Sequence, residues 1–95
     1  METKLNSVIH QELRLAVLSL LVGIKEADFS YLKTQTKSTQ GNLSIQLKKL
    51  EEAKYITIKK QFNGNYPQTI CSLTEQGRIA FEEYIEQIKL YLKLS

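Results

Sequence analysis

The segment from Ser7 to Ile24 constrains the fold most, because it is apolar on two opposite sides of a helix. At helical spacing, the first side carries Leu13, Ala16, Val17, Leu20, Leu21 and Ile24. The opposite side carries Leu15, Leu18 and Val22. A helix that is apolar all round must be buried all round, and a chain of 95 residues forms one domain, 1–95, with a single modest core. The pattern therefore predicts a partner chain against this helix.

The next segment predicts two helices joined by a tight turn. A short helix is expected after residues 28–29, with Ser30 as its N-cap and its end near Lys37. The second helix is expected to begin with Ser38 or Thr39 as its cap. Two helices joined by three or four residues form a helix-turn-helix. The residues at 28–29 are extended in character and can also pair as a short strand.

The second half of the chain predicts a β-hairpin and a long helix. Residues 55–62, "YITIKKQF", are rich in β-branched and aromatic residues, and 69–73, "TICSL", form the returning strand. Between them, 63–68 supply an Asn-Gly turn and a proline. Thr74 caps a final helix, 74–94. This order predicts an α+β, mainly α, winged helix-turn-helix with three helices, a β-hairpin wing and a long C-terminal helix.

The positive charge of the chain lies in its middle third. The net charge is only +3, but residues 33–68 carry seven lysines against Glu51 and Glu52. The flanking thirds, 1–32 and 69–95, are each slightly acidic. A concentration of this kind suits a polyanion. A solvated lysine surface is the alternative that charge alone leaves open.

The helix expected over 39–53 has one apolar side, formed by Leu43, Leu47 and Leu50. Its other side suits a DNA groove. Gly41 has no side chain that would hold the helix N-terminus away from the DNA backbone. The polar residues can reach base edges, and Ile45 can contact thymine methyl groups. The lysines can contact phosphates. The predicted DNA-binding residues are Thr39, Gln40, Gly41, Asn42, Ser44, Ile45, Gln46, Lys48, Lys49, Lys59 and Lys60. An ordinary capped, solvated helix is the alternative.

Nothing in the sequence predicts catalysis or a cofactor. His10 is the sole histidine and has no nucleophile or carboxylate placed by a motif beside it. Cys71 is the sole cysteine, so no disulfide framework or metal-ligand cluster is expected. Strand alternation places Cys71 and Leu73 toward the core, and a redox-sensing thiol is the alternative.

The start of the chain does not resemble a signal peptide. The apolar run 13–22 is about half of the ~20 residues that a membrane span needs. A soluble, cytoplasmic protein is expected.

Three stretches carry a resemblance to a known family, and they cover roughly residues 5 to 92. These are "IHQELRLAVLSLL", "GNLSIQLKKLEEAKYI" and "SLTEQGRIAFEEYI". They resemble the small winged-helix transcriptional regulators of the MarR/ArsR-like group. The resemblance implies a dimeric DNA-binding regulator with a recognition helix over Thr39–Lys49 and a wing tip at 62–68.

Three departures from this family pattern stand out. Lys54 stands where relatives usually have glycine in a left-handed C-cap, so strain or a different cap is expected. Gln46 stands where relatives often have histidine. The wing tip lacks the cation that usually enters a minor groove, and Lys59 and Lys60 are expected to contact phosphates instead. The wing-tip residues are Asn63, Gly64, Asn65 and Tyr66.

The last helix, 74–94, is long for a domain of this size and is apolar along its distal half. Together with the helix at 7–24, it predicts a two-fold homodimer that presents two recognition helices about 34 Å apart. The predicted interface residues are Leu15, Leu18, Val22, Tyr84, Ile88, Tyr91 and Leu92. A last helix folded over its own core is the alternative.

The sequence therefore predicts sequence-specific binding of double-stranded DNA at a palindromic operator, by a homodimer that represses transcription. The alternative is a winged-helix interaction module that binds an acidic partner protein. A small-molecule effector is left open. Tyr84 and Tyr91 can line a pocket for one between the dimer helices, or can pack in the interface.

Overall fold

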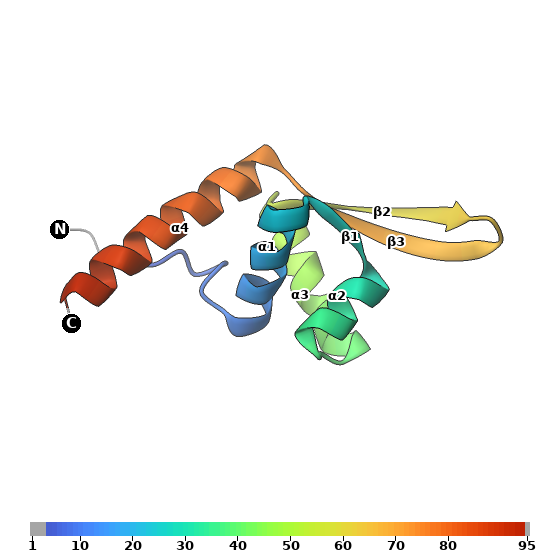
Figure 1. The fold of residues 1–95 in the computed structure, drawn as a ribbon, viewed down its shortest axis with the longest axis horizontal. Helices are drawn as coiled ribbons and strands as arrows, with labels where there is room; N and C mark the ends of the chain where they lie inside the picture. Colours follow the sequence, from blue (N-terminus) through green and yellow to red (C-terminus); the bar gives the residue numbers. More distant parts are fainter. Residues whose placement is uncertain (1–3, 95) are drawn as a thin grey trace.

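The computed structural model describes residues 4–94 and has the predicted order of elements. Figure 1 shows the N-terminal helices at the centre, with a β-hairpin projecting to one side and the last helix to the other. The molecule is elongated, with extents of 53 × 25 × 21 Å. The elements are α1 (Glu12–Ile24), β1 (Glu26–Asp28), α2 (Phe29–Thr36), α3 (Gln40–Glu52), β2 (Ile56–Asn63), β3 (Tyr66–Leu73) and α4 (Glu75–Leu94). The α+β winged helix-turn-helix is confirmed.

The three strands form one antiparallel sheet in the order β1-β3-β2. The short strand expected near residues 28–29 is present as β1, and Ala27 pairs with Cys71 on β3. The hairpin is longer than predicted, since β2 and β3 pair from Ile56–Leu73 out to Asn63–Tyr66. Pro67 had suggested a loop, but β1 pairs only with 70–72, so at residue 67 the strand has a free edge that tolerates a proline.

The turn of the hairpin is only two residues, Gly64 and Asn65. Gly64 has φ +65°, a left-handed conformation that glycine adopts without a steric cost. The wing is therefore a regular ribbon almost to its tip, rather than two short strands with a six-residue loop.

The first helix begins at Glu12, five residues later than predicted. Asn6 accepts hydrogen bonds through Oδ1 from the backbone N–H groups of Val8 (2.9 Å) and Ile9 (3.2 Å). This local turn competes with the helix. Gln11 is then the N-cap, and its side chain accepts from the N–H of Arg14 at 2.8 Å.

Side chains cap the other helices as well. Asp28, rather than the predicted Ser30, caps α2 and accepts from the N–H of Tyr31 at 2.7 Å. Thr39, one of the two predicted candidates, caps α3, and Thr74 caps α4 as predicted. Lys54 follows α3 with φ +67°, a left-handed conformation that is uncommon for a lysine, so of the two expectations at this position the structure has strain rather than a different cap.

The core lies around α1, which packs against α2, α3, α4, β1 and β3. These elements cover Leu18, which is 0% exposed, but leave Val22 near the end of α1 37% exposed. This corrects the expectation that Leu18 needs a partner chain, because neighbouring elements of the same chain bury it, whereas for Val22 a partner chain stays a prediction. The core residues are Ile9, Leu13, Val17, Leu18, Leu21, Leu32, Leu43, Leu47, Leu50, Ile56, Cys71 and Tyr84. Within residues 4–94, no helix combines the length and the apolar character that crossing a membrane requires.

Candidate nucleic-acid interface

Helix α3 has one buried side and one exposed side. Leu43, Leu47 and Leu50 are buried in the core, as the helical period predicted. Ile45 on the other side is 56% exposed, although it is a large apolar residue. The exposed residues predicted to bind DNA are Thr39, Gln40, Gly41, Asn42, Ser44, Ile45, Lys48 and Lys49, whereas Gln46 is half-buried. The structure thus brings these side chains onto one surface, here called the α3 surface.

The turn between α2 and α3 presents the start of α3 to solvent. Lys37 adopts a left-handed conformation with φ +54°, and its N–H donates to the carbonyl of Thr34 at 3.3 Å. Thr39 then accepts from the N–H of Asn42 at 3.2 Å. The first turn of a helix carries backbone N–H groups without helical partners, which favour an anion such as phosphate. A Cβ on Gly41 would meet nothing within 4 Å, so the chain's own packing does not require a glycine there.

Gln46 is tied to the protein by two hydrogen bonds. Its Oε1 accepts from Nη1 of Arg14 at 2.5 Å, and its Nε2 donates to Oδ1 of Asn42 at 3.1 Å. Gln46 is therefore less available to a base than the sequence suggested. Arg14 is absent from the sequence prediction because it lies on α1, 32 residues away, and no local pattern links the two positions.

A groove of about 440 Å³ separates α3 from the wing. Its walls include Gln40, Ser44 and Lys48 from α3, and Ile58, Lys60 and Thr69 from the hairpin. Strand alternation places Lys60 on the same face of β2 as Ile58, and Lys59 on the opposite face. The structure therefore brings Lys60, but not Lys59, next to the α3 surface.

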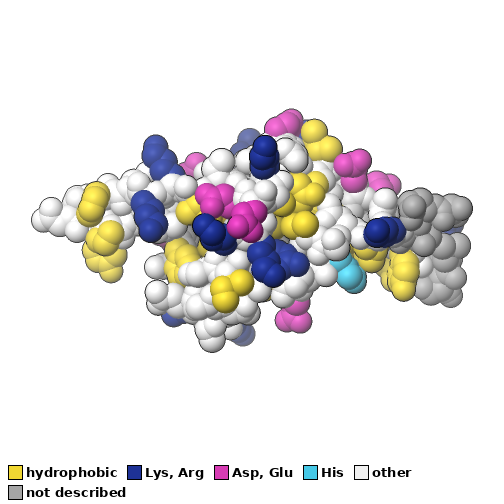
Figure 2. Space-filling model, turned by 180° about the vertical axis from the view of Figure 1, so that it is seen from behind, with side chains coloured by type: hydrophobic (Ala, Val, Ile, Leu, Met, Phe, Trp, Pro, Cys, Tyr) yellow, Lys and Arg dark blue, Asp and Glu magenta, His cyan; other side chains and the backbone are white. Residues whose placement is uncertain are grey.

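The wing carries exposed aromatic side chains beside its lysines. Phe62 is 74% exposed and Tyr66 is 75% exposed. Phe62 is paired with Pro67 and shares the face of Lys60, whereas Tyr66 is paired with Asn63 on the other face. Residues 57–70 contain no aspartate or glutamate. Figure 2 shows hydrophobic and basic side chains along this projecting part, on the left of the view.

The distal half of α4 and the end of α1 expose apolar side chains. Val22 is 37% exposed, Tyr91 53% and Leu92 66%. Of the other residues predicted for a dimer interface, Leu15 and Ile88 are half-buried against the chain's own core. Tyr84 is only 3% exposed, and its hydroxyl is hydrogen-bonded to Nδ1 of His10 at 2.8 Å. Like Leu18, Tyr84 is therefore covered by its own chain and cannot form a partner surface.

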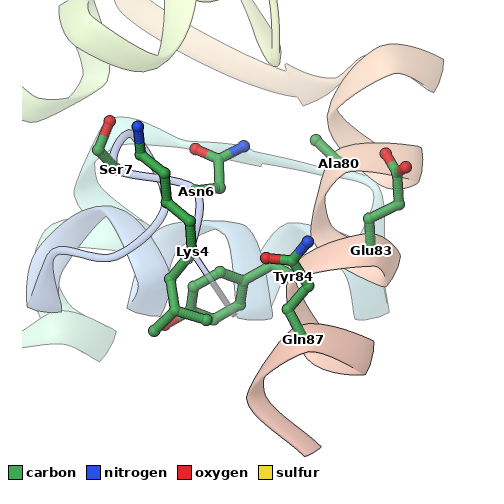
Figure 3. Close-up of a pocket in the computed structure, with 8 residues that line it drawn as sticks. Lys4, Asn6, Ser7, Ala80, Glu83, Tyr84 and Gln87 are labelled. Carbon is green, nitrogen blue, oxygen red and sulfur yellow. The ribbon is translucent and has the colours of Figure 1, made fainter. Parts of the chain in front are cut away.

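Two cavities lie between residues 4–10 and α4, on the side of the molecule where α4 projects. Figure 3 shows the first, of about 450 Å³, with the N-terminal segment on one side and α4 on the other. The labelled lining residues are Lys4, Asn6, Ser7, Ala80, Glu83, Tyr84 and Gln87. Tyr91 lines the second cavity with His10 and Ile88. The two tyrosines thus line separate cavities of a single chain.

Cys71 lies at the centre of the sheet and is 0% exposed. Burial raises the pKa of its thiol to about 11, with smaller contributions from the charges of Glu51 and Asp28. A thiol of this kind is almost entirely protonated near neutral pH and is a poor nucleophile. Across residues 4–94, histidine, cysteine, aspartate and glutamate form no group of three or more that could hold a metal ion.

A helix-turn-helix whose second helix exposes a polar and basic surface beside a β-hairpin defines a winged-helix protein. Comparison with known families agrees: the chain belongs to the winged helix DNA-binding domain family, whose model matches residues 13–92. An uncharacterised protein of Methanocaldococcus jannaschii is 41% identical over 83 residues, which cover 87% of this chain and 86% of the relative.

Solved structures share the fold. A transcriptional regulator homologue from Pyrococcus horikoshii superposes with a TM-score of 0.86 at 20% identity, over 93% of this chain and 87% of that one. AbfR bound to DNA superposes with a TM-score of 0.72 at 22% identity, over 80% of this chain and 55% of AbfR. The similarity to AbfR therefore covers about half of that longer protein.

Proposed function

We propose that this protein binds double-stranded DNA sequence-specifically as a homodimer and regulates transcription in the cytoplasm as a repressor. The observation that carries the proposal is the α3 surface: a capped helix, held by three buried leucines, that exposes small polar residues, Ile45 and two lysines. In a winged-helix protein such a helix enters the major groove. AbfR, which shares the fold, has been solved bound to DNA.

The residues of the α3 surface divide into two roles in this proposal. Lys48 and Lys49 contact phosphates and supply affinity that does not depend on sequence. Asn42, Ser44 and Ile45 face base edges and supply specificity. Lys60 extends the phosphate contact from the wing, because it lines the same groove as Lys48.

Dimerisation is proposed through the exposed apolar residues at the end of α1 and on the distal half of α4. Val22, Tyr91 and Leu92 are the main candidates, with Leu15 and Ile88 at the margin. A two-fold axis through an interface of these residues would relate the α3 surfaces of two protomers. Because the two surfaces would then bind identical half-sites in opposite directions, the DNA site would be an inverted repeat. Sedimentation of the purified protein and of Leu92→Glu tests this: a wild-type monomer would contradict it.

Selection from a library of random duplexes with the purified full chain tests the function. The expected result is an inverted repeat with half-sites about one helical turn apart. Enrichment of no sequence, together with binding that is weak on every duplex, would contradict the proposal and favour an acidic protein partner. Binding at several salt concentrations adds a second criterion, since each phosphate contact contributes about −0.9 to the slope of log K against log salt.

Two sets of variants separate the proposed roles. The double variant Lys48→Ala, Lys49→Ala is expected to weaken binding to all duplexes alike and to reduce the salt slope. Asn42→Ala is expected to change the selected sequence while keeping the slope. If both variants change affinity and sequence preference in the same way, the assignment of roles is wrong. Repression itself is tested by transcription in vitro from a promoter that carries the selected repeat.

A further inference from the structure

Arg14 connects the N-terminal segment and α1 to the α3 surface. Its Nε donates to the carbonyl of Val8 at 2.5 Å, and its Nη2 donates to the carbonyl of Ser7 at 3.4 Å. Its Nη1 donates to Oε1 of Gln46. With contacts on two backbone carbonyls, the guanidinium is held in one place beside α3. It does not extend into solvent as an unattached side chain.

The direction of each hydrogen bond in this network follows from the chemistry of arginine. A guanidinium can only donate, so Gln46 must turn its oxygen toward Arg14. The NH₂ group of Gln46 then points along α3 and donates to Oδ1 of Asn42 at 3.1 Å. Asn42 in turn must present its oxygen to Gln46. The NH₂ group of Asn42, an exposed residue, stays open to a ligand, together with the second lone pair of its oxygen.

We infer that Arg14 is a positioning residue that makes Asn42 a hydrogen-bond donor to the DNA base it faces. This rests on the proposed function of the α3 surface. An unrestrained asparagine reads adenine with both its oxygen and its NH₂ group. In Asn42, Gln46 takes one of the two lone pairs of Oδ1, which leaves one acceptor site beside two N–H donors and weakens the adenine pair relative to a base that presents two acceptors. Guanine presents two adjacent acceptors, O6 and N7, in the major groove, and is the base that a donor at this position selects.

The identity of Gln46 matters for the same reason. A glutamine can accept on one side and donate on the other, so it transmits the direction set by Arg14 to Asn42. A carboxylate at this position would accept from both neighbours. In Gln46→Glu, Asn42 must therefore turn its NH₂ group inward and present its oxygen to the base. The expected preference changes from guanine to a base that donates, such as cytosine through N4.

Duplex selection with four proteins tests the inference. The wild type is expected to select guanine at one position of each half-site. Replacing that guanine with 7-deazaguanine, which lacks the N7 acceptor, is expected to lower the affinity about tenfold, near the lower end of the free energy of a good base contact. Arg14→Leu is expected to lose the guanine preference at that position and at no other. Arg14→Lys is expected to retain it, because lysine also only donates. Gln46→Glu is expected to prefer a base that donates, such as cytosine, at the same position. An unchanged guanine preference in both Arg14→Leu and Gln46→Glu would overturn the inference.

A measurement without DNA keeps the inference separate from the proposed function. Side-chain amide NMR of the free protein is expected to show slow hydrogen exchange for the NH₂ group of Gln46 and fast exchange for that of Asn42. Arg14→Leu should remove the difference while the backbone spectrum shows an intact fold. If the NH₂ group of Asn42 is the protected one, the direction of the network is opposite and the inference fails, whatever the protein binds. If the wild type selects no duplex while the amide pattern is as expected, the proposed function fails instead.

Discussion

The first turn of α4 lies directly on the backbone of Tyr55, and the contact is made by Gly77. A Cβ atom at Gly77 would overlap the carbonyl oxygen of Tyr55 and lie 2.9 Å from its carbonyl carbon. The same carbonyl oxygen accepts from the N–H of Thr74 at 3.1 Å. The hydroxyl of Thr74 also donates to the carbonyl of Lys54 at 2.7 Å. The residues that follow α3 and the beginning of α4 are thus joined, and the Tyr55 backbone that faces Gly77 cannot move aside as a flexible side chain could.

Replacing Gly77 with alanine is therefore expected to destabilise the protein. Gly77→Ala should lower the free energy of unfolding by about 2–3 kcal/mol, the upper part of the ~1–3 kcal/mol that overpacking typically costs, because the atoms it meets are backbone. Gly23→Ala is the matched control, because a Cβ there would meet nothing within 4 Å and alanine favours a helix by about 0.5–1 kcal/mol over glycine. Urea unfolding followed by circular dichroism measures both. Equal effects of the two changes would show that α4 does not depend on this contact.

Gly41→Ala separates stability from DNA binding. The position is open and helical, so alanine is expected to raise the free energy of unfolding by about 0.5 kcal/mol. If the start of α3 approaches a DNA backbone closely, the added methyl group should nevertheless weaken binding about tenfold, or about 1.4 kcal/mol. Thermal unfolding and duplex titration give the two numbers. A variant that is more stable and binds equally well would exclude a close approach at Gly41.

The two wing lysines are expected to differ in their effect on DNA binding. Lys60 lines the groove beside Ser44 and Lys48, whereas Lys59 lies on the opposite face of β2. Lys60→Ala should reduce the salt slope of binding by about 0.9, corresponding to one phosphate contact. Lys59→Ala removes the same charge and serves as the control, with little change expected. A larger effect at Lys59 would mean that the wing meets the duplex with its other face.

Cys71 is expected to make stability depend on pH in the alkaline range. The pKa of its thiol is raised in the folded chain from an ordinary value of 9.0 to about 11. Above pH 9 the unfolded chain loses this proton while the folded chain keeps it, so the unfolded state gains stability. The thiol's contribution is fully present below pH 9 and is lost as the pH rises to about 11. Denaturant unfolding of wild type and Cys71→Ala across this range isolates the thiol from other groups, and a constant difference between them would contradict the expectation.

Local sequence patterns determined much of this protein. The periods of 3.6 and 2 placed the helices and the hairpin, and the apolar spacing of Leu43, Leu47 and Leu50 identified the exposed side of α3. Thr74 marked the start of α4, and Thr39 was one of two adjacent candidates for the start of α3. Each of these features depends on residues within a few positions of one another, so the chain does not need to be folded for the pattern to be read.

Only the tertiary structure decided which side chains are covered and which are held together. The sequence predicted Leu18 and Tyr84 to lie in a dimer interface, yet neighbouring elements of the same chain bury both side chains. Arg14 and Gln46 are 32 residues apart, and their hydrogen bond exists only because α1 packs against α3. Contacts between residues far apart in the sequence depend on how whole helices and strands pack against one another, and no local sequence period encodes that packing.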